Sequence, residues 1–188
     1  MKKVIIGLTG ASGSIYFKKT IEILSSRDYF IHVIASDNGK KVFEYELEEN
    51  FEEFITKFDN VKLEQNQNMF SQTASGSFPI DGMMIIPCSM GTVGKIASGT
   101  SDSLLIRAAD VCIKEQKKMV IAFRESPLSL VHLNNLTLLA KTNTFLNPLV
   151  NYNYNKPKTL EEAIEQTVLR NISYLEGSIE ESIIWKKK

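Results

Sequence analysis

The sequence predicts an α/β fold: a single Rossmann-like or flavodoxin-like domain, with a parallel sheet and helices on both faces. Short apolar runs, such as residues 4–8, 82–86 and 119–123, carry no charged residue, as is typical of strands buried on both faces of a parallel sheet. Segments with helical spacing of apolar residues alternate with these runs. No stretch rich in proline, glycine or serine divides the 188 residues, so we expect one domain over 1–188.

The first half of the chain shows the alternation clearly. Its expected elements are a strand over 4–8, a helix over 15–24, a strand over 29–35 and two charged, exposed helices over 40–49 and 51–58. The glycine-rich stretch 9–14 separates the first strand from its helix as a tight turn. Residues 60–77 are polar and irregular, and no element is expected there.

The second half continues the same pattern. Its expected elements are a strand over 82–86, short helices over 91–97 and 103–115, a strand over 119–123, a helix over 130–141, a strand over 144–150 and a last helix ending at 175. Thr159 is a good N-cap for the last helix, and Glu162 stands three residues later. This spacing predicts a capping box.

Composition limits the class of partner. Lys+Arg total 22 and Asp+Glu total 22, and this zero net charge argues against a dedicated nucleic-acid binder. Cys88 and Cys112 lie in apolar runs, where buried reduced thiols are expected rather than a disulfide framework. No segment approaches the roughly 20 apolar residues that span a bilayer, and the first apolar run is too short for a signal peptide. We therefore expect a cytoplasmic protein with no membrane partner.

The ends of the predicted strands carry unusual residues. Parallel sheets bind ligands outside the carboxyl ends of their strands, and the residues there are Gly10-Ala11-Ser12-Gly13, Ser36, Pro87-Cys88-Ser89 and Arg124-Glu125. The G-x-x-G-x-x-G spacing at the first turn is neither the Rossmann fingerprint nor a Walker A loop. Two interpretations stay open for this turn: backbone amides that bind a phosphate, or a tight turn that needs glycine for its backbone angles.

The side chains at these ends also allow two interpretations each. The hydroxyls of Ser12, Ser36, Ser89 and Thr92 suit the phosphate and ribityl chain of a mononucleotide, and they equally suit helix capping. Glu125, directly after a strand, is a candidate acid or base, or else the partner of Arg124 in a local ion pair. His32 and His132 lack metal-ligand spacing, so we expect structural roles for both and no metal.

A series of short motifs runs along nearly the whole chain. In order they are Gly10-Ala11-Ser12-Gly13, Ala74-Ser75-Gly76-Ser77, Pro87-Cys88-Ser89, Arg107-Ala108-Ala109-Asp110, Lys114-Glu115, Arg124-Glu125-Ser126-Pro127-Leu128, and Tyr154 with Pro157. Each motif alone is weak, but their order and spacing are specific. With them the chain resembles the UbiX-type flavin prenyltransferases, a flavoprotein family related to the homo-oligomeric flavin-containing cysteine decarboxylases. Residues 147–154 depart from the family pattern, because they lack its usual proline pair and the Phe before the tyrosine.

The resemblance implies an activity and partners. Enzymes of this family transfer a dimethylallyl group from dimethylallyl phosphate to N5 and C6 of reduced FMN, and phosphate leaves. They need no metal. Prenylated FMN then serves a UbiD-type decarboxylase. The family assembles into large homo-oligomers, typically dodecamers, in which neighbouring subunits help to complete the site.

The resemblance also implies a role for individual residues. The expected FMN contacts are Gly10, Ala11, Ser12, Gly13, Ser36, Ala74, Ser75, Ser89, Thr92 and Arg107. The expected contacts to the prenyl donor are Lys114, Arg124, Tyr154, Arg170 and, as an aromatic wall, Trp185. Glu125 is expected to protonate the leaving phosphate, with Ser12 in the proton path and Glu46 as a further active-site carboxylate.

Two rival functions are weighed against this one. An FMN-dependent peptidyl-cysteine decarboxylase needs a catalytic histidine and an Asn-bearing loop where this chain has Pro87-Cys88-Ser89-Met90. A non-catalytic flavin-binding protein needs the flavin contacts but not the cations of the donor site. Because the chain keeps both sets, the sequence favours the prenyltransferase.

Overall fold

The computed structural model describes residues 1–184 and contains one six-stranded sheet in the order β3-β2-β1-β4-β5-β6. Each neighbouring pair of strands is parallel. The strands are β1 Lys2–Leu8, β2 Tyr29–Ala35, β3 Val61–Glu64, β4 Gly82–Cys88, β5 Lys118–Phe123 and β6 Thr144–Pro148. This confirms the predicted parallel sheet. Its order is the Rossmann order rather than the 2-1-3-4-5 order of flavodoxin.

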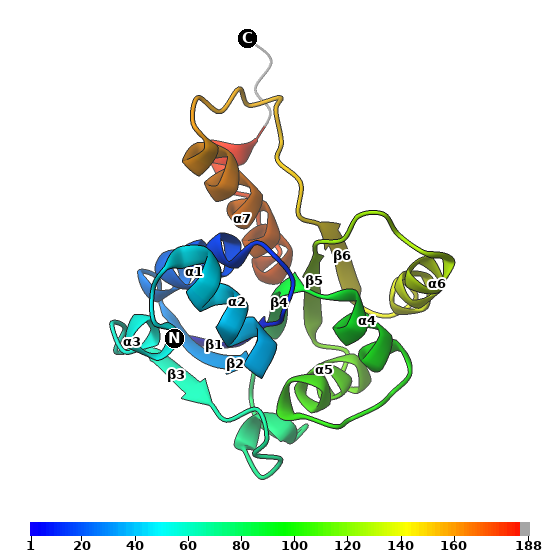
Figure 1. Ribbon diagram of the computed structural model, residues 1–188. Helices are drawn as coiled ribbons and strands as arrows, with labels where there is room; N and C mark the ends of the chain where they lie inside the picture. The colour runs from blue at the N-terminus through cyan, green and yellow to red at the C-terminus, as the bar shows by residue number, and fades with distance from the viewer. Residues whose placement is uncertain (185–188) are drawn as a thin grey trace.

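Helices cover both faces of the sheet (Figure 1). The α-helices are α1 Ser14–Ser25, α2 Asp37–Leu47, α3 Phe51–Ile55, α4 Met90–Ala97, α5 Leu104–Lys114, α6 Leu130–Leu139 and α7 Leu160–Glu176. Short 3-10 helices are η1 Gln72–Ala74 and η2 Glu181–Ile183. Side chains alternate along the strands: Val4 and Ile6 pack with α1, α2, α3 and α7, whereas Ile5 packs with α4, α5 and α6. The two faces therefore carry separate apolar clusters.

The stretch 60–77, for which the sequence predicts no element, contains the edge strand β3 and the helix η1. Strand β3 pairs with β2, with Ile31 opposite Val61. Two of its residues, Lys62 and Glu64, are charged. The apolar pattern that identified the other strands is therefore absent from the sequence of β3, and its pairing depends on the neighbouring strand.

Helix ends are capped by the expected residues, with one change of partner. Thr159 Oγ1 accepts a hydrogen bond from the backbone N–H of Glu162 at 3.1 Å, which confirms the N-cap of α7. The Glu162 carboxylate accepts from the N–H of Lys158 at 2.6 Å, one residue before the position expected in a capping box. His132 has a structural role, because its Nδ1 and the Ser129 side chain form a capping box at the start of α6.

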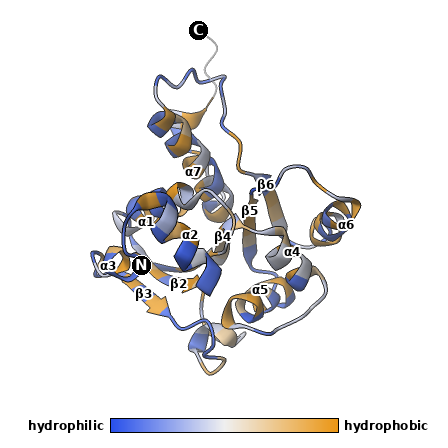
Figure 2. Ribbon diagram, viewed as in Figure 1, coloured by the Kyte–Doolittle hydropathy of each residue, from blue (hydrophilic) through white to orange (hydrophobic). Residues whose placement is uncertain are grey.

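Buried thiols and surface features complete the fold. Cys88 and Cys112 are both 0% exposed, and burial raises the pKa of each thiol, that of Cys112 to about 12. Across residues 1–184, no helix has both the length and the apolar composition needed to cross a membrane. Apolar side chains on α6, at the edge of the molecule in Figure 2, are exposed, with Leu130 at 72% and Val131 at 66%.

Candidate functional site at the carboxyl edge of the sheet

The centre of the candidate site is the point where β1 and β4 lie side by side and the chain leaves them on opposite faces. Thr9 joins the two strand ends: its hydroxyl donates to the carbonyl of Pro87 at 2.8 Å and accepts from the N–H of Ser89 at 2.8 Å. Thr9 is 1% exposed, so this link is a buried part of the scaffold. The place where the chain leaves two neighbouring strands on opposite faces is the topological switch point, and the crevice there is the usual ligand site of doubly wound sheets.

The glycine-rich turn after β1 has a backbone that requires glycine. Gly13 has φ +113°, a left-handed value that side-chain-bearing residues rarely adopt. A Cβ on Gly10 would lie 2.9 Å from Cβ of Asn38, so the turn also packs closely against the start of α2. Of the two interpretations left open, this geometry supports the tight turn.

The amides of this turn bind a carboxylate of the chain itself. Glu46, near the end of α2, accepts hydrogen bonds from the N–H of Gly13 at 3.0 Å and of Ser14 at 2.7 Å. Burial opposes ionisation of Glu46, but hydrogen bonds from Ser12 and from these backbone amides outweigh it and hold its pKa below the usual value. A negative charge therefore stands at the N-terminus of α1, and it belongs to Glu46.

The N-termini of α2 and α4 instead face an open cleft of about 610 Å³. Its lining includes Gly10, Ser36, Ser89 and Thr92 of the predicted set, together with Asp37, Asn38, Asn66, Gln67, Lys95, Asp102 and Leu105, which the sequence analysis does not single out. Ser36 and Ser89 also cap their helices, accepting from Gly39 N–H at 3.0 Å and Thr92 N–H at 3.3 Å. The capping interpretation is confirmed for Ser36 and Ser89, which also line the cleft. It is wrong for Ser12, because α1 begins after Gly13 without a side-chain cap, and for Thr92, which lies inside α4.

A second group of predicted residues lies along η1 and α5. Arg107 Nε donates to the carbonyl of Ala74 at 3.3 Å, and its guanidinium pairs with Asp110 at 2.8 Å. Lys114 pairs with Glu115 close to Gly76, where a Cβ would come within 2.8 Å of Lys114 Nζ. Arg107 thus lies beside Ala74 and Lys114 beside Gly76. Arg107, Ala74, Ser75 and Lys114 are not among the residues that line the strand-edge cleft.

The segment that carries Ala74 and Ser75 is tied to the sheet through a buried hydrogen-bonded pair. His32 on β2 and Glu64 at the end of β3 are 5% and 7% exposed, with His32 Nδ1 2.9 Å from Glu64 Oε1. The second carboxylate oxygen of Glu64 accepts from the hydroxyl of Ser71, which caps η1, at 3.1 Å. The ring of Phe78 packs edge-on against His32. His32 is therefore a structural residue, as its lack of metal-ligand spacing suggests.

Arg124 and Glu125 follow β5 at the same sheet edge. The backbone N–H of Arg124 bonds the carbonyl of Cys88 at 3.4 Å, which places this turn beside the end of β4. Glu125 Oε1 accepts from the N–H of Ser126 at 3.1 Å, and both side chains are exposed. Burial raises the pKa of Tyr16 on α1, and the charge of Arg124 opposes this shift.

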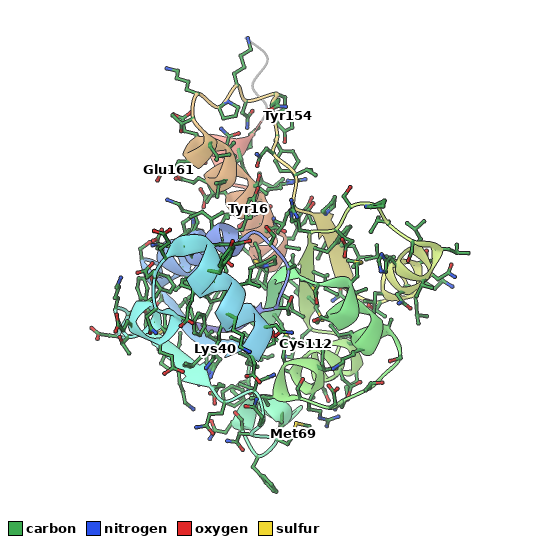
Figure 3. The ribbon with its side chains drawn as sticks, viewed as in Figure 1. Tyr16, Lys40, Met69, Cys112, Tyr154 and Glu161 are labelled. Carbon is green, nitrogen blue, oxygen red and sulfur yellow. The ribbon has the colours of Figure 1, made fainter. Side chains whose placement is uncertain are left out.

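A third group lies beyond β6. Tyr154 and Arg170 line a pocket of about 520 Å³ together with Ile179, Ile183 and Ile184. The guanidinium of Arg170 stacks 4.8 Å above the ring of Tyr174. Trp185, the expected aromatic wall, lies outside the described residues. In Figure 3, Tyr154 and Met69, which precedes η1, lie at opposite ends of the molecule.

The structure therefore distributes the predicted residues over the strand-edge cleft, the η1–α5 group and the pocket beside α7. In the cleft, hydroxyls and helix N-termini stand beside the charged side chains of Asp37, Lys95 and Asp102. The predicted cations Arg107, Lys114 and Arg170 stand in the other two groups. In the described part of the chain, no cluster of three or more His, Cys, Asp or Glu residues is arranged to hold a metal ion. The hydroxyls and helix N-termini of the cleft are donors that suit an anionic ligand.

Fold and cleft define a class: doubly wound α/β proteins that bind an anionic ligand at the topological switch point. The family model described as Flavoprotein matches residues 1–173. The flavin prenyltransferase LpdB of Lactiplantibacillus plantarum is 41% identical over 171 residues, covering 90% of each chain. The chain belongs to the flavoprotein family and, within it, to the UbiX-type flavin prenyltransferases.

Two solved structures share the whole fold. AnUbiX (PadA1), crystallised in complex with FMN and dimethylallyl pyrophosphate, has a TM-score of 0.92 at 29% identity and covers 100% of this chain, which covers 98% of it. The dodecameric FMN-dependent UbiX-like decarboxylase of Escherichia coli O157:H7 also has a TM-score of 0.92, at 31% identity, with coverage of 98% and 100%. The similarity therefore extends over the complete domain.

Proposed function

We propose that this chain transfers a dimethylallyl group from dimethylallyl phosphate to N5 and C6 of reduced FMN. The observation that carries the proposal is the strand-edge cleft flanked by Arg124 and Glu125, in a chain 41% identical to a flavin prenyltransferase. Prenylated FMN would then serve a UbiD-type decarboxylase.

The hydrogen-bond donors of the cleft fit a flavin mononucleotide. Hydroxyls of Ser36, Ser89 and Thr92, with the N-termini of α2 and α4, offer hydrogen bonds to a phosphate. Glu46 already occupies the N-terminus of α1 and would repel a phosphate there. The phosphate of FMN would therefore bind at the N-termini of α2 and α4, and Ser12 and Glu46 would lie beside the ring system.

The reaction breaks the allylic C–O bond of the donor and forms bonds to N5 and C6, and phosphate leaves. Reduced FMN supplies the nucleophilic N5 and C6. Positive charge develops on the allyl carbon and negative charge on the phosphate. Lys114, Arg124 and Arg170, with the phenol of Tyr154, would stabilise that phosphate by charge-assisted hydrogen bonds. The bond to C6 uses the double bond of the prenyl group, and N5 and C6 each lose one proton. One of these protons ends on the middle carbon of the prenyl group, and Glu125 would pass the equivalent of the other to the leaving phosphate.

Completion of the proposed site would require more than one copy of the chain. Lys114 stands at the end of α5, beside the start of β5, whereas Tyr154 and Arg170 lie beyond the opposite end of the sheet. A single chain therefore separates the residues that would hold one phosphate. We propose a homo-oligomer, a dodecamer as in the E. coli relative, with the exposed apolar side chains of α6 in contacts between copies.

One assay tests the activity. The protein is incubated without oxygen with reduced FMN and dimethylallyl phosphate, and the flavin is then analysed by mass spectrometry. A five-carbon adduct is the expected product. Bound FMN that stays unmodified would contradict the proposal and favour a flavin-binding protein, whereas oxidative decarboxylation of a C-terminal cysteine peptide would favour the decarboxylase. Light scattering after size-exclusion chromatography tests the assembly.

A further inference from the structure

A buried amide pair connects the last strand to the last helix. Asn147 on β6 is 8% exposed and Asn171 on α7 is 0% exposed. Asn147 Nδ2 donates to Asn171 Oδ1 at 3.0 Å. Buried amides are costly unless they are hydrogen-bonded, so a pair in the core indicates that the contact fixes a particular geometry.

The pair is the middle of a longer chain of hydrogen bonds. Tyr152 donates its hydroxyl to Asn147 Oδ1 at 3.4 Å, and Asn171 Nδ2 donates to the backbone carbonyl of Thr167 at 2.8 Å. All three bonds run in the same direction, from the loop through the strand to the helix. Successive bonds of this kind strengthen one another.

The two ends of this chain of bonds flank the pocket beside α7. Tyr152 precedes Tyr154 by two positions, and their ring centroids are 5.7 Å apart. Asn171 directly follows Arg170 on the helix. The network therefore fixes the loop that carries the phenol relative to the helix that carries the guanidinium, although neither asparagine lines the pocket.

A second link connects the same loop to the first turn of the protein. Asn151 Oδ1 accepts from the hydroxyl of Tyr16 at 3.1 Å, and the hydroxyl of Thr167 lies 3.2 Å from the carbonyl of Val150. Tyr16 in turn interacts with the charge of Arg124. These two hydrogen bonds therefore connect the loop to α1 and to α7.

We propose that Asn147, Asn171 and Tyr152 are positioning residues for the prenyl donor. They hold Tyr154 and Arg170 in one orientation, so that phenol and guanidinium bind the same phosphate. The inference rests on the proposed function, and it assigns to the network a role in donor binding rather than in flavin binding.

The test uses two variants of the whole protein. The double variant Asn147→Leu with Asn171→Leu replaces both partners by apolar groups of similar size, so no buried amide is left unpaired. Tyr152→Phe removes only the hydroxyl. We expect kcat/KM for dimethylallyl phosphate to fall about 10-fold to 100-fold in the double variant, through KM rather than kcat. Tyr152→Phe should show a smaller change in the same direction, and the Kd of FMN should change less than about threefold in both.

Asn60→Leu is the matched control. Asn60 Nδ2 also holds a segment by two backbone carbonyls, those of Ser25 at 3.0 Å and Tyr29 at 2.9 Å, but at the opposite edge of the sheet. It should lower the Tm without changing KM for the donor. Hydrogen exchange of residues 149–158 should become faster in the double variant and not in the control.

The outcomes separate the inference from the function on which it rests. A folded double variant with unchanged KM for dimethylallyl phosphate would overturn the inference, as would equal losses in donor and FMN affinity. If the unmodified protein forms no five-carbon adduct, the proposed function fails, and the positioning role fails with it. An active protein whose variants bind the donor normally contradicts the positioning role alone.

Discussion

The strand-edge cleft and the pocket beside α7 are built in different ways. The cleft is lined by strand ends and helix N-termini, and the hydroxyl of Thr9 joins the ends of β1 and β4 through the backbone groups of Pro87 and Ser89. The pocket lies beyond the sheet, and its residues are held by side-chain hydrogen bonds between a loop and α7. The topology of the sheet therefore positions the residues of the proposed flavin site, whereas a few side-chain hydrogen bonds position those of the proposed donor site.

The largest effect that separates the two regions is expected at Glu125, which stands between them. Glu125→Gln keeps the size of the side chain but cannot donate a proton to the leaving phosphate. Turnover should fall about 100-fold to 10,000-fold, while the affinity for FMN stays the same. Single-turnover mass spectrometry and flavin titration measure the two quantities. Glu161→Gln, an exposed carboxylate that pairs with Lys19, is the control. Equal losses of turnover and FMN binding would give Glu125 a structural role.

Arg107 tests whether the η1–α5 group belongs with the flavin. Arg107→Ala removes the donor to the Ala74 carbonyl and a cation from that group. The Kd of FMN should rise about 10-fold to 100-fold, as expected for a hydrogen bond from a charged group. Equilibrium dialysis of FMN measures the change. Arg27→Ala, which removes an ion pair with Glu176 elsewhere, serves as the comparison. Unchanged FMN affinity in Arg107→Ala would remove Arg107 from the flavin site.

The smallest effect is expected for a substitution of Glu46, which stabilises the turn beside the cleft. The pKa of Glu46 is lowered in the folded protein, so its ionised form stabilises the fold above the unfolded pKa of about 4.3. That contribution is lost as the pH falls through the lower, folded pKa. Glu46→Gln should therefore reduce the free energy of unfolding at neutral pH by about 1 kcal/mol, and the difference from wild type should shrink in acid. Urea unfolding at several pH values measures it, and a difference that is constant with pH would contradict this role.

Much of the fold is predictable from the sequence, because the buried strands β1, β4 and β5 carry continuous apolar runs that need no partner to be recognised. Strand β3 is not predictable from the sequence, since two of its residues are charged and its pairing depends on β2. Site residues at strand ends follow from the position of the strands. That rule identifies Ser36 and Ser89 but not Asn66, which lies in the irregular stretch.

Long-range side-chain contacts account for the rest. The carboxylate of Glu46 reaches the N–H of Gly13 from a residue 33 positions away. Asn147 and Asn171 are 24 positions apart. Neither pair can be recognised from a short spacing in the sequence, because both contacts depend on how the helices pack against the sheet and against one another. The division of the predicted residues among separate groups is likewise a property of the packed chain.

The carboxylate of Glu46 at the N-terminus of α1 also bears on which ligands can bind beside the first strand. In Rossmann proteins that use nicotinamide dinucleotides, the pyrophosphate rests on the helix that follows the first strand. Here Glu46 holds that position with its own negative charge. A dinucleotide in the usual pose would bring its pyrophosphate against this carboxylate, and the repulsion between the two negative charges would disfavour that pose.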